Sequence, residues 1–191
     1  MKLIFSLSLC FGFAMTTMAQ SFKNAKQSNY NFKQVQRLDA SPVESQGQTG
    51  TCWSFSALSF LESEIMRINN SDEPIVLSEM FIVRKAYEAK AKKYVRMDGR
   101  TNFGEGGAFH DIPYVIQNFG IVPRSVYSGL KKKKDVYNHG AMFDRLDSIV
   151  QKAKSSGNGI QAEWISAYNT ELDKGIGELP KDFKYKGTSY T

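Results

Sequence analysis

Apolar residues recur every three or four positions in five stretches of the chain, the spacing that places them on one face of a helix. Turn-forming residues separate these stretches. Only three short pieces have the composition of extended backbone, and they lie at 75–77, 121–122 and 183–190. The five predicted helices lie at about 52–68, 78–97, 108–118, 142–156 and 161–174. The pattern therefore predicts a mainly helical domain with little sheet.

The first predicted helix begins at Cys52, the only cysteine outside the N-terminal leader. Gly47 and Gly50 make the approach a tight loop. A thiol at a helix N-terminus lies beside unpaired N–H groups and the positive end of the dipole, which favour the thiolate over the thiol. Cys52 is therefore a candidate nucleophile, although a cysteine in such a place can also be buried and inert. The predicted core stripe of this helix comprises Trp53, Ala57, Leu61, Ile65 and Ile68.

Residues 99–107 hold four glycines, at positions 99, 104, 106 and 107. Backbone without Cβ atoms can approach a ligand closely, and an extended peptide could pair with it. We therefore expect Gly106 and Gly107 to lie beside Cys52 across the same cleft. The alternative is a flexible loop without a binding role.

The segment Thr49-Gly50-Thr-Cys52-Trp53 resembles the nucleophile segment of papain-like cysteine peptidases, whose signature is Cys-Gly-Ser/Ala-Cys-Trp/Tyr. Thr49 replaces the first cysteine of that signature, so the disulfide that many family members anchor there cannot form. Gln46, six residues before Cys52, stands where the family keeps its oxyanion-hole glutamine. By this resemblance, the Gln46 side-chain amide and the Cys52 backbone N–H would hold the developing oxyanion.

A second resemblance lies downstream. The segment 104–109, Gly-Glu-Gly-Gly-Ala-Phe, looks like the family's Gly-Gly substrate-groove segment, and 115–127 looks like the helix and turn that follow it. Within the family, the bleomycin hydrolase and aminopeptidase C branch fits better than papain itself, on the segments 77–81, 120–127 and 177–183. The resemblance covers about residues 40–191.

The resemblance implies a cysteine-type peptidase of α+β papain-like fold, aminopeptidase-like in its action on peptides or proteins. Cys52 would be the nucleophile and Gln46 would complete the oxyanion hole. It implies neither a cofactor nor a metal. Two other functions stay open: a secreted binding or inhibitory module without the chemistry and, more weakly, a thiol redox protein, for which the chain lacks a Cys-X-X-Cys pair. The implied substrate-binding residues are Gly50, Trp53, Gly106 and Gly107.

A thiol peptidase needs a base, normally a histidine oriented by a third group. The chain has two histidines. His110 falls inside the third predicted helix, and the residues after His139 have helical spacing, whereas the family's histidine begins a strand. The family places its histidine and asparagine about 130–150 residues after the cysteine, and no histidine follows His139. We therefore expect the chain to be the mainly helical N-terminal lobe of a longer protein, lacking the strand-rich lobe with both residues, and to be inactive alone.

Residues 1–19 have the pattern of a secretory signal peptide, with a lysine at the start, an apolar run and the small residue Ala19 before the expected cleavage. The alternative is an uncleaved anchor, but the apolar run is too short to span a bilayer. Residues 20–40 are polar and weakly patterned, which predicts an extended lead-in. Residues 41–191 would then form the truncated peptidase domain of a secreted or periplasmic protein.

The net charge is +6, and its densest run is Lys131–Lys134. A run of this kind is usually a solvated loop. Nucleic-acid binding would require a basic stripe with stacking aromatics or a known module, and the sequence has neither. We expect a peptide or protein as the partner, no nucleic acid and no stable membrane insertion. The sequence does not determine the oligomeric state.

Overall fold

The computed structural model describes residues 26–27, 29–30, 32–132, 134–156 and 163–191. The chain divides into two compact units, Met1–Arg37 and Leu38–Thr191. The described residues of the first unit are exposed and form neither helix nor strand, and the predicted signal peptide lies outside the described residues. None of the helices in the described part of the chain is long and apolar enough to cross a lipid bilayer.

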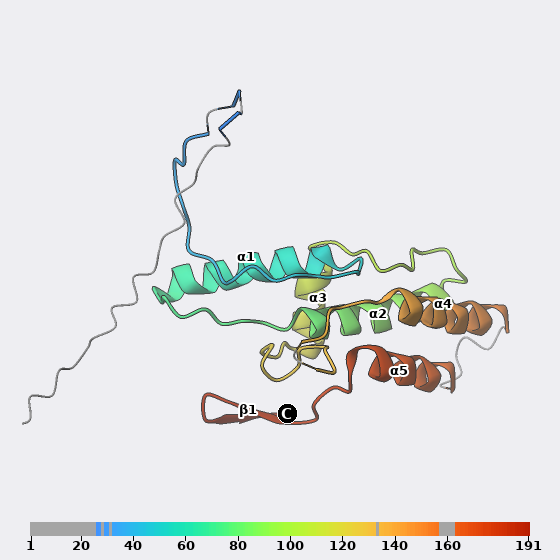
Figure 1. Ribbon diagram of the computed structural model, residues 1–191. Coiled ribbons are helices and arrows are strands. Elements are labelled where there is room, and N and C mark those ends of the chain that lie inside the picture. The colour runs from blue at the N-terminus through green and yellow to red at the C-terminus, as the bar shows by residue number, and fades with distance from the viewer. Residues whose placement is uncertain (1–25, 28, 31, 133, 157–162) are drawn as a thin grey trace, which may run out of the picture. The chain divides into compact units, whose positions relative to one another are not determined.

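The second unit contains all five of the helices that the apolar spacing predicts, followed by one β-hairpin (Figure 1). The predicted helix end at Gly157 and the predicted helix start at 161 fall outside the described residues. The helices are α1 (Cys52–Asn69), α2 (Glu79–Arg96), α3 (Asp111–Phe119), α4 (Gly140–Ser155) and α5 (Glu163–Ile176), and the strands are β1 (Phe183–Tyr185) and β2 (Thr188–Tyr190).

Helix α2 is the centre of this unit, because it packs against α1, α3, α4 and α5. Ser78 caps it: the Ser78 hydroxyl accepts the N–H of Phe81 at 3.0 Å and donates to the carbonyl of Tyr127. The first half of the helix is buried except at Lys85, which is half-buried. The residues buried there are Glu79, Met80, Phe81, Ile82, Val83, Arg84, Ala86 and Tyr87.

Aromatic rings and one arginine join α2 to α4 and α5. The Tyr87 and Phe143 rings meet edge to face at 5.6 Å, and the Tyr168 hydroxyl donates to the Tyr87 carbonyl at 3.2 Å. Arg84, which is 4% exposed, donates to the Gly177 carbonyl at 2.7 Å and to an Asp173 carboxylate oxygen at 2.6 Å. A buried charge is tolerated only when it is paired in this way.

The core stripe of α1 differs from the predicted one. Ile68 is 69% exposed, and the stripe instead contains the carboxylate of Glu62, which is 4% exposed. This burial is possible because Glu62 accepts the Leu77 N–H at 2.7 Å and the Ser41 hydroxyl. The buried residues of α1 are Trp53, Ser54, Ala57, Leu58, Glu62 and Met66.

Helix α3 begins three residues later than predicted, at Asp111 and not at 108. The Asp111 carboxylate accepts the N–H of Ala108 at 3.0 Å, and this bond closes a turn in front of the helix. Ala108 and Phe119 are exposed, contrary to the prediction, while Ile112 and Val115 are buried as expected. The glycine-rich segment therefore stays non-helical up to the turn.

The predicted extended pieces pair only briefly. Leu77 and Pro123 form an isolated antiparallel bridge, so the pieces at 75–77 and 121–122 meet each other without becoming a sheet. The third piece is the hairpin of β1 and β2. Its turn residues Lys186 and Gly187 have φ angles of 46° and 83°, as a tight two-residue hairpin turn requires.

Gly175 of α5 lies against Met142 of α4: a Cβ built there would be 2.1 Å from the Met142 sulfur. Alanine normally stabilises a helix relative to glycine by about 1 kcal/mol, but here its methyl group would overlap a buried side chain. We expect Gly175→Ala to lower the free energy of unfolding by about 1–3 kcal/mol, measured by urea unfolding. Gly140→Ala in α4 is the control, because its nearest neighbour would lie at 3.8 Å. Equal stability of the two variants would contradict this packing.

Candidate active site

Cys52 is the first residue of α1, and its side chain is exposed. The next residue, Trp53, is 7% exposed and belongs to the core. Thr51 stands before the helix and makes no side-chain capping bond, so it does not occupy the N–H groups of the first turn. The thiol therefore lies outside the core at a helix N-terminus, as the sequence predicts.

The loop before Cys52 is closed by its own side chains. The Gln46 side-chain nitrogen donates to the Thr49 carbonyl at 2.6 Å, and the Thr49 hydroxyl donates to the Gln46 carbonyl at 2.9 Å. The hydroxyls of Thr49 and Thr51 also bond to each other. Since an amide nitrogen carries two N–H groups, Gln46 keeps one donor beyond its bond to Thr49.

Backbone pairing with the residues before α4 holds this loop in place. Gln48 N–H donates to the Tyr137 carbonyl at 2.8 Å, and His139 N–H donates to the Gln48 carbonyl at 3.2 Å. Gly47 has a φ of 60°, and a Cβ there would lie 2.5 Å from the Tyr137 carbonyl oxygen, so only glycine fits. The sequence analysis missed this pairing, because no local pattern links segments so far apart.

The glycine-rich segment lies against the start of α1. The Trp53 indole N–H donates to the Glu105 carbonyl at 3.0 Å, and the Gly50 N–H donates to the Glu105 carboxylate at 2.6 Å. A Cβ at Gly107 would lie 2.6 Å from the Trp53 ring, whereas one at Gly106 would meet nothing within 4 Å. Gly107 therefore lies against Trp53, the residue after Cys52, and the backbone at Gly106 stays open. The cleft shared with Cys52 stays a prediction, because the groove that Gly106 and Gly107 line does not include Cys52.

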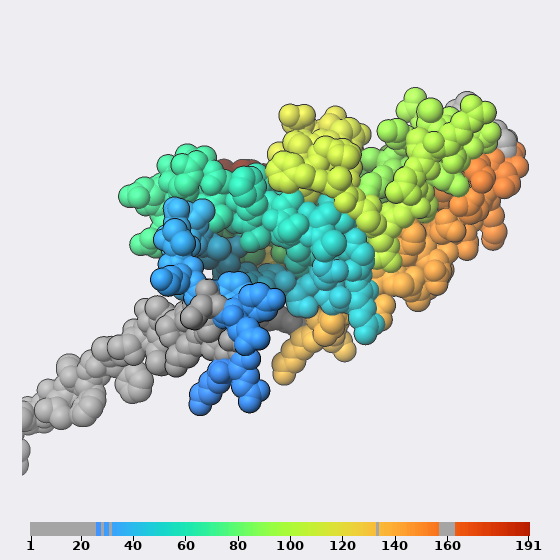
Figure 2. Space-filling model, turned by 90° about the horizontal axis from the view of Figure 1, so that it is seen from above, coloured from blue at the N-terminus to red at the C-terminus, as the bar shows by residue number. Residues whose placement is uncertain are grey.

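The same face continues toward α3. The Phe60 ring of α1 meets the Phe109 ring edge to face at 6.2 Å, and Figure 2 shows the residues around α3 beside α1. A groove of about 1120 Å³ between α2 and residues 101–119 includes Gly106 and Gly107 in its lining. The basic side chains of this groove are Lys90, Lys92, Lys93 and Arg96.

Lys90 and Glu105 are site residues that the sequence analysis did not single out. The Lys90 ammonium group donates to the Gly106 carbonyl at 2.6 Å and lies 5.0 Å from the centre of the Trp53 ring. Glu105 could have been noticed as a charged residue enclosed by glycines. Lys90 carries no such signal, because it is one of many lysines on its helix.

Neither histidine is placed as a base for Cys52. His110 directly precedes α3 and does not lie inside it; its side chain is 83% exposed, 3.7 Å from the Asp111 carboxylate. His139 directly precedes α4 and is 2% exposed, and neither ring nitrogen has a hydrogen-bond partner in the described part of the chain. Burial lowers the pKa of His139 to about 4. Within the same residues, no cluster of His, Cys, Asp or Glu could hold a metal ion.

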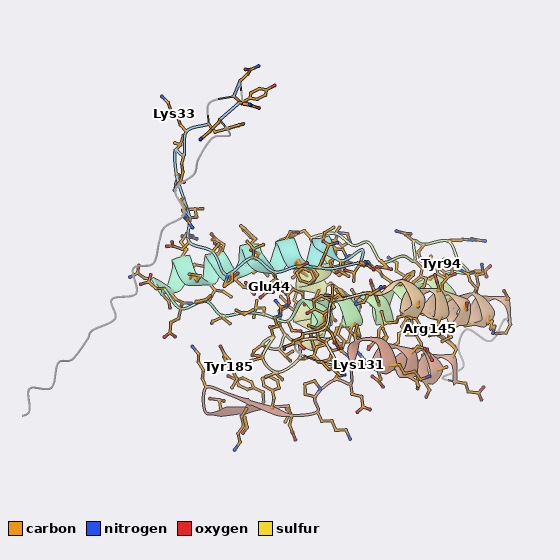
Figure 3. The ribbon with its side chains drawn as sticks, viewed as in Figure 1. Lys33, Glu44, Tyr94, Lys131, Arg145 and Tyr185 are labelled. Atoms are coloured by element: carbon orange, nitrogen blue, oxygen red, sulfur yellow. The ribbon has the colours of Figure 1, made fainter. Side chains whose placement is uncertain are left out.

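A buried carboxylate lies in the first turn of α2, behind the start of α1. Ser54 of α1 donates to the carbonyl of Glu79 at 3.0 Å. Burial raises the pKa of the Glu79 carboxyl to about 7, although Arg124 stands 3.5 Å away. Arg124 also pairs with Glu44, labelled in Figure 3, at 2.8 Å. The ion pairs of Arg124 with Glu44 and Glu79 thus connect the segment before the nucleophile loop to α2.

Comparison with known proteins identifies the family. The family model described as papain family cysteine protease matches residues 26–169, and the chain belongs to this family. Among solved structures, it is similar to PepW from Lactobacillus rhamnosis HN001, with a TM-score of 0.59 and 19% identity over 80% of this chain. The match covers 41% of that chain, so this sequence spans less than half of its length. No curated protein matches. The predicted papain-like fold is confirmed, whereas the branch and the single lobe stay predictions.

The two buried titratable groups predict opposite pH dependences. The pKa of His139 is lowered from 6.5 to about 4. As the pH falls through this range, the unfolded chain takes up the proton before the folded chain does, so the folded state loses stability. Glu79 has a pKa raised from 4.5 to about 7, so the fold binds its proton first and gains stability as the pH falls. Each slope approaches about 1.4 kcal/mol per pH unit.

We therefore expect the unfolding free energy of the unmodified chain to change little between pH 5 and about pH 6.5, because the two slopes oppose each other. The unfolding free energy of the His139→Met variant should rise on acidification, and that of the Glu79→Gln variant should fall. Urea unfolding at three pH values measures all three proteins. Parallel pH profiles of the three proteins would show that burial shifts the pKa of neither His139 nor Glu79.

Proposed function

We propose that the chain supplies the nucleophile of a cysteine-type peptidase and that Cys52 is this nucleophile. One observation carries the proposal: the exposed thiol stands at an uncapped helix N-terminus, and the next residue packs under the backbone of Gly107. A substrate backbone lying along Gly106 and Gly107 would present its carbonyl carbon to the thiol. Membership of the papain family supports the same reaction class.

The reaction would proceed by covalent catalysis. The Cys52 thiolate attacks the substrate carbonyl, and the Cys52 backbone N–H together with the free donor of Gln46 stabilises the oxyanion. Collapse of this intermediate breaks the C–N bond and leaves a thioester on the sulfur, while the base that removed the thiol proton returns it to the leaving amine. Water then hydrolyses the thioester and releases the acid and the thiol.

The base must come from outside the residues described so far, because neither His110 nor His139 is positioned to take the thiol proton. We infer that a strand-rich second lobe supplies histidine and asparagine and that residues 41–191 are the mainly helical lobe. The sequence resemblance favours an aminopeptidase of the bleomycin hydrolase branch. The pattern of residues 1–19 favours export to the periplasm or the medium.

The same observation about the histidines favours a second function. A secreted binding or inhibitory module could keep the groove beside Gly106 and Gly107 without hydrolysing the peptide in it. A free aminoacyl coumarin amide and an N-blocked dipeptide coumarin amide, offered to the protein with its second lobe, separate the two. Hydrolysis that requires Cys52 and prefers the free amine supports the aminopeptidase; binding without hydrolysis supports the module.

Gln46→Ala tests the oxyanion hole. We expect kcat to fall by about 10²–10³-fold, because loss of one preorganised donor weakens binding of the transition state and not of the substrate. KM should change little. Gln48→Ala is the matched control in the same loop, since the Gln48 side chain bonds only to Asn138, at 2.9 Å, among the described residues. A Gln46 variant as active as the control would remove Gln46 from the mechanism.

Alkylation by iodoacetamide tests the missing base. The 191-residue chain should react like an ordinary exposed thiol, because a helix N-terminus favours the thiolate by only about 0.3–1 kcal/mol. The protein with its second lobe should react much faster at mildly acidic pH, since an imidazolium would then stabilise the thiolate. Fast acidic labelling of the 191-residue chain alone would instead identify His110 or His139 as the base.

A further inference from the structure

Glu105 joins the two segments that flank the candidate nucleophile through both of its ends. Its carboxylate accepts the Gly50 N–H at 2.6 Å, and its main-chain carbonyl accepts the Trp53 indole N–H at 3.0 Å. Gly50 stands two residues before Cys52, and Glu105 directly precedes Gly106. One residue therefore ties the nucleophile loop to the glycine backbone.

The fit between these segments leaves no room for other residues. A Cβ on Gly50 would lie 2.7 Å from the Cβ of Glu105, so the glycine at this position permits the contact. Hydrogen bonds to an ionised acceptor are shorter and stronger than bonds between neutral groups. The bond also crosses between loops that share no secondary structure, so no ladder of backbone bonds replaces it.

Lys90 fixes the other side of the same segment. Its ammonium group donates to the Gly106 carbonyl at 2.6 Å and stands 3.5 Å from the Asp111 carboxylate. Its position over the Trp53 ring adds a cation–π contact. The segment is thus attached to α2 by Lys90 and to the nucleophile loop by Glu105.

We propose that Glu105 is a positioning residue that fastens the Gly106–Gly107 backbone to the nucleophile loop without a covalent bond. Thr49 occupies the position at which a cysteine would be needed for a disulfide, and Cys52 is the only cysteine after residue 25. The spacing of the groove then depends on a carboxylate and is independent of thiol reagents. We call the bond from the Gly50 N–H to the Glu105 carboxylate the clamp. The catalytic consequence of the clamp rests on the proposed function, whereas the clamp itself does not.

Amide hydrogen exchange at Gly50, followed by NMR in the 191-residue chain, tests the clamp directly. We expect Glu105→Ala to speed this exchange at least about tenfold, the factor for a loss of roughly 1.4 kcal/mol. Glu105→Gln keeps an oxygen acceptor and should restore most of the protection. The Trp53 indole N–H should stay protected in both, because its acceptor is main-chain. Glu64→Ala is the control, since Glu64 pairs only with Arg67 on the outer face of α1.

The catalytic consequence is tested on the protein with its second lobe, using a dipeptide coumarin amide with a free N-terminus. Glu105→Ala should raise KM about tenfold with kcat within about threefold, and Glu105→Gln should recover KM. Iodoacetamide labelling of Cys52, which needs no substrate strand, should stay unchanged. A merely structural role would lower the melting temperature and the apparent kcat and would leave KM unchanged.

The outcomes separate the two proposals. Unchanged Gly50 exchange in Glu105→Ala, or a KM equal to that of the unmodified enzyme, would overturn the clamp. Faster Gly50 exchange in a protein that hydrolyses nothing would support the clamp and contradict the peptidase.

Discussion

The burial of Trp53 determines the arrangement of the candidate site. Its ring packs under Gly107, its indole N–H bonds to Glu105, and the ammonium group of Lys90 lies over its face. Successive residues of a helix point about 100° apart. Because Trp53 is held in the core, the neighbouring Cys52 side chain lies outside it and is exposed. The position of the thiol is thus set by its neighbour and not by contacts of its own.

Helix α2 provides the rigid surface against which this start of α1 is fixed. Its first half is buried except at Lys85, and two polar contacts join it and the preceding residue Leu77 to α1: Glu62 accepts the Leu77 N–H, and Ser54 donates to the Glu79 carbonyl. Since an unpaired buried polar group is costly, each of these bonds specifies where a loop must run. The buried polar residues therefore position the loops, while the apolar residues hold the helices together.

The two histidines illustrate how position limits function. His139 lies close to the nucleophile loop through its backbone, yet its ring is buried and stays uncharged, so it cannot exchange protons with an exposed thiol. His110 is exposed but faces a carboxylate of α3. A cysteine and a histidine can form a catalytic pair, but the surroundings of these two histidines exclude such a pair with Cys52.

The sequence by itself determined the five helices, the start of α1 at Cys52 and the family, because apolar spacing and the residues around the cysteine are local signals. Only the tertiary structure decided that Glu62 enters the core, that α3 starts at Asp111, and that Glu105 and Lys90 hold the glycine backbone. The roles of Glu62, Glu105 and Lys90 depend on partners far away in the sequence, and the start of α3 depends on the turn that Asp111 closes with Ala108. A carboxylate or a lysine has the same local pattern whether it is solvated or bonded across two loops, so long-range contacts had to decide its role.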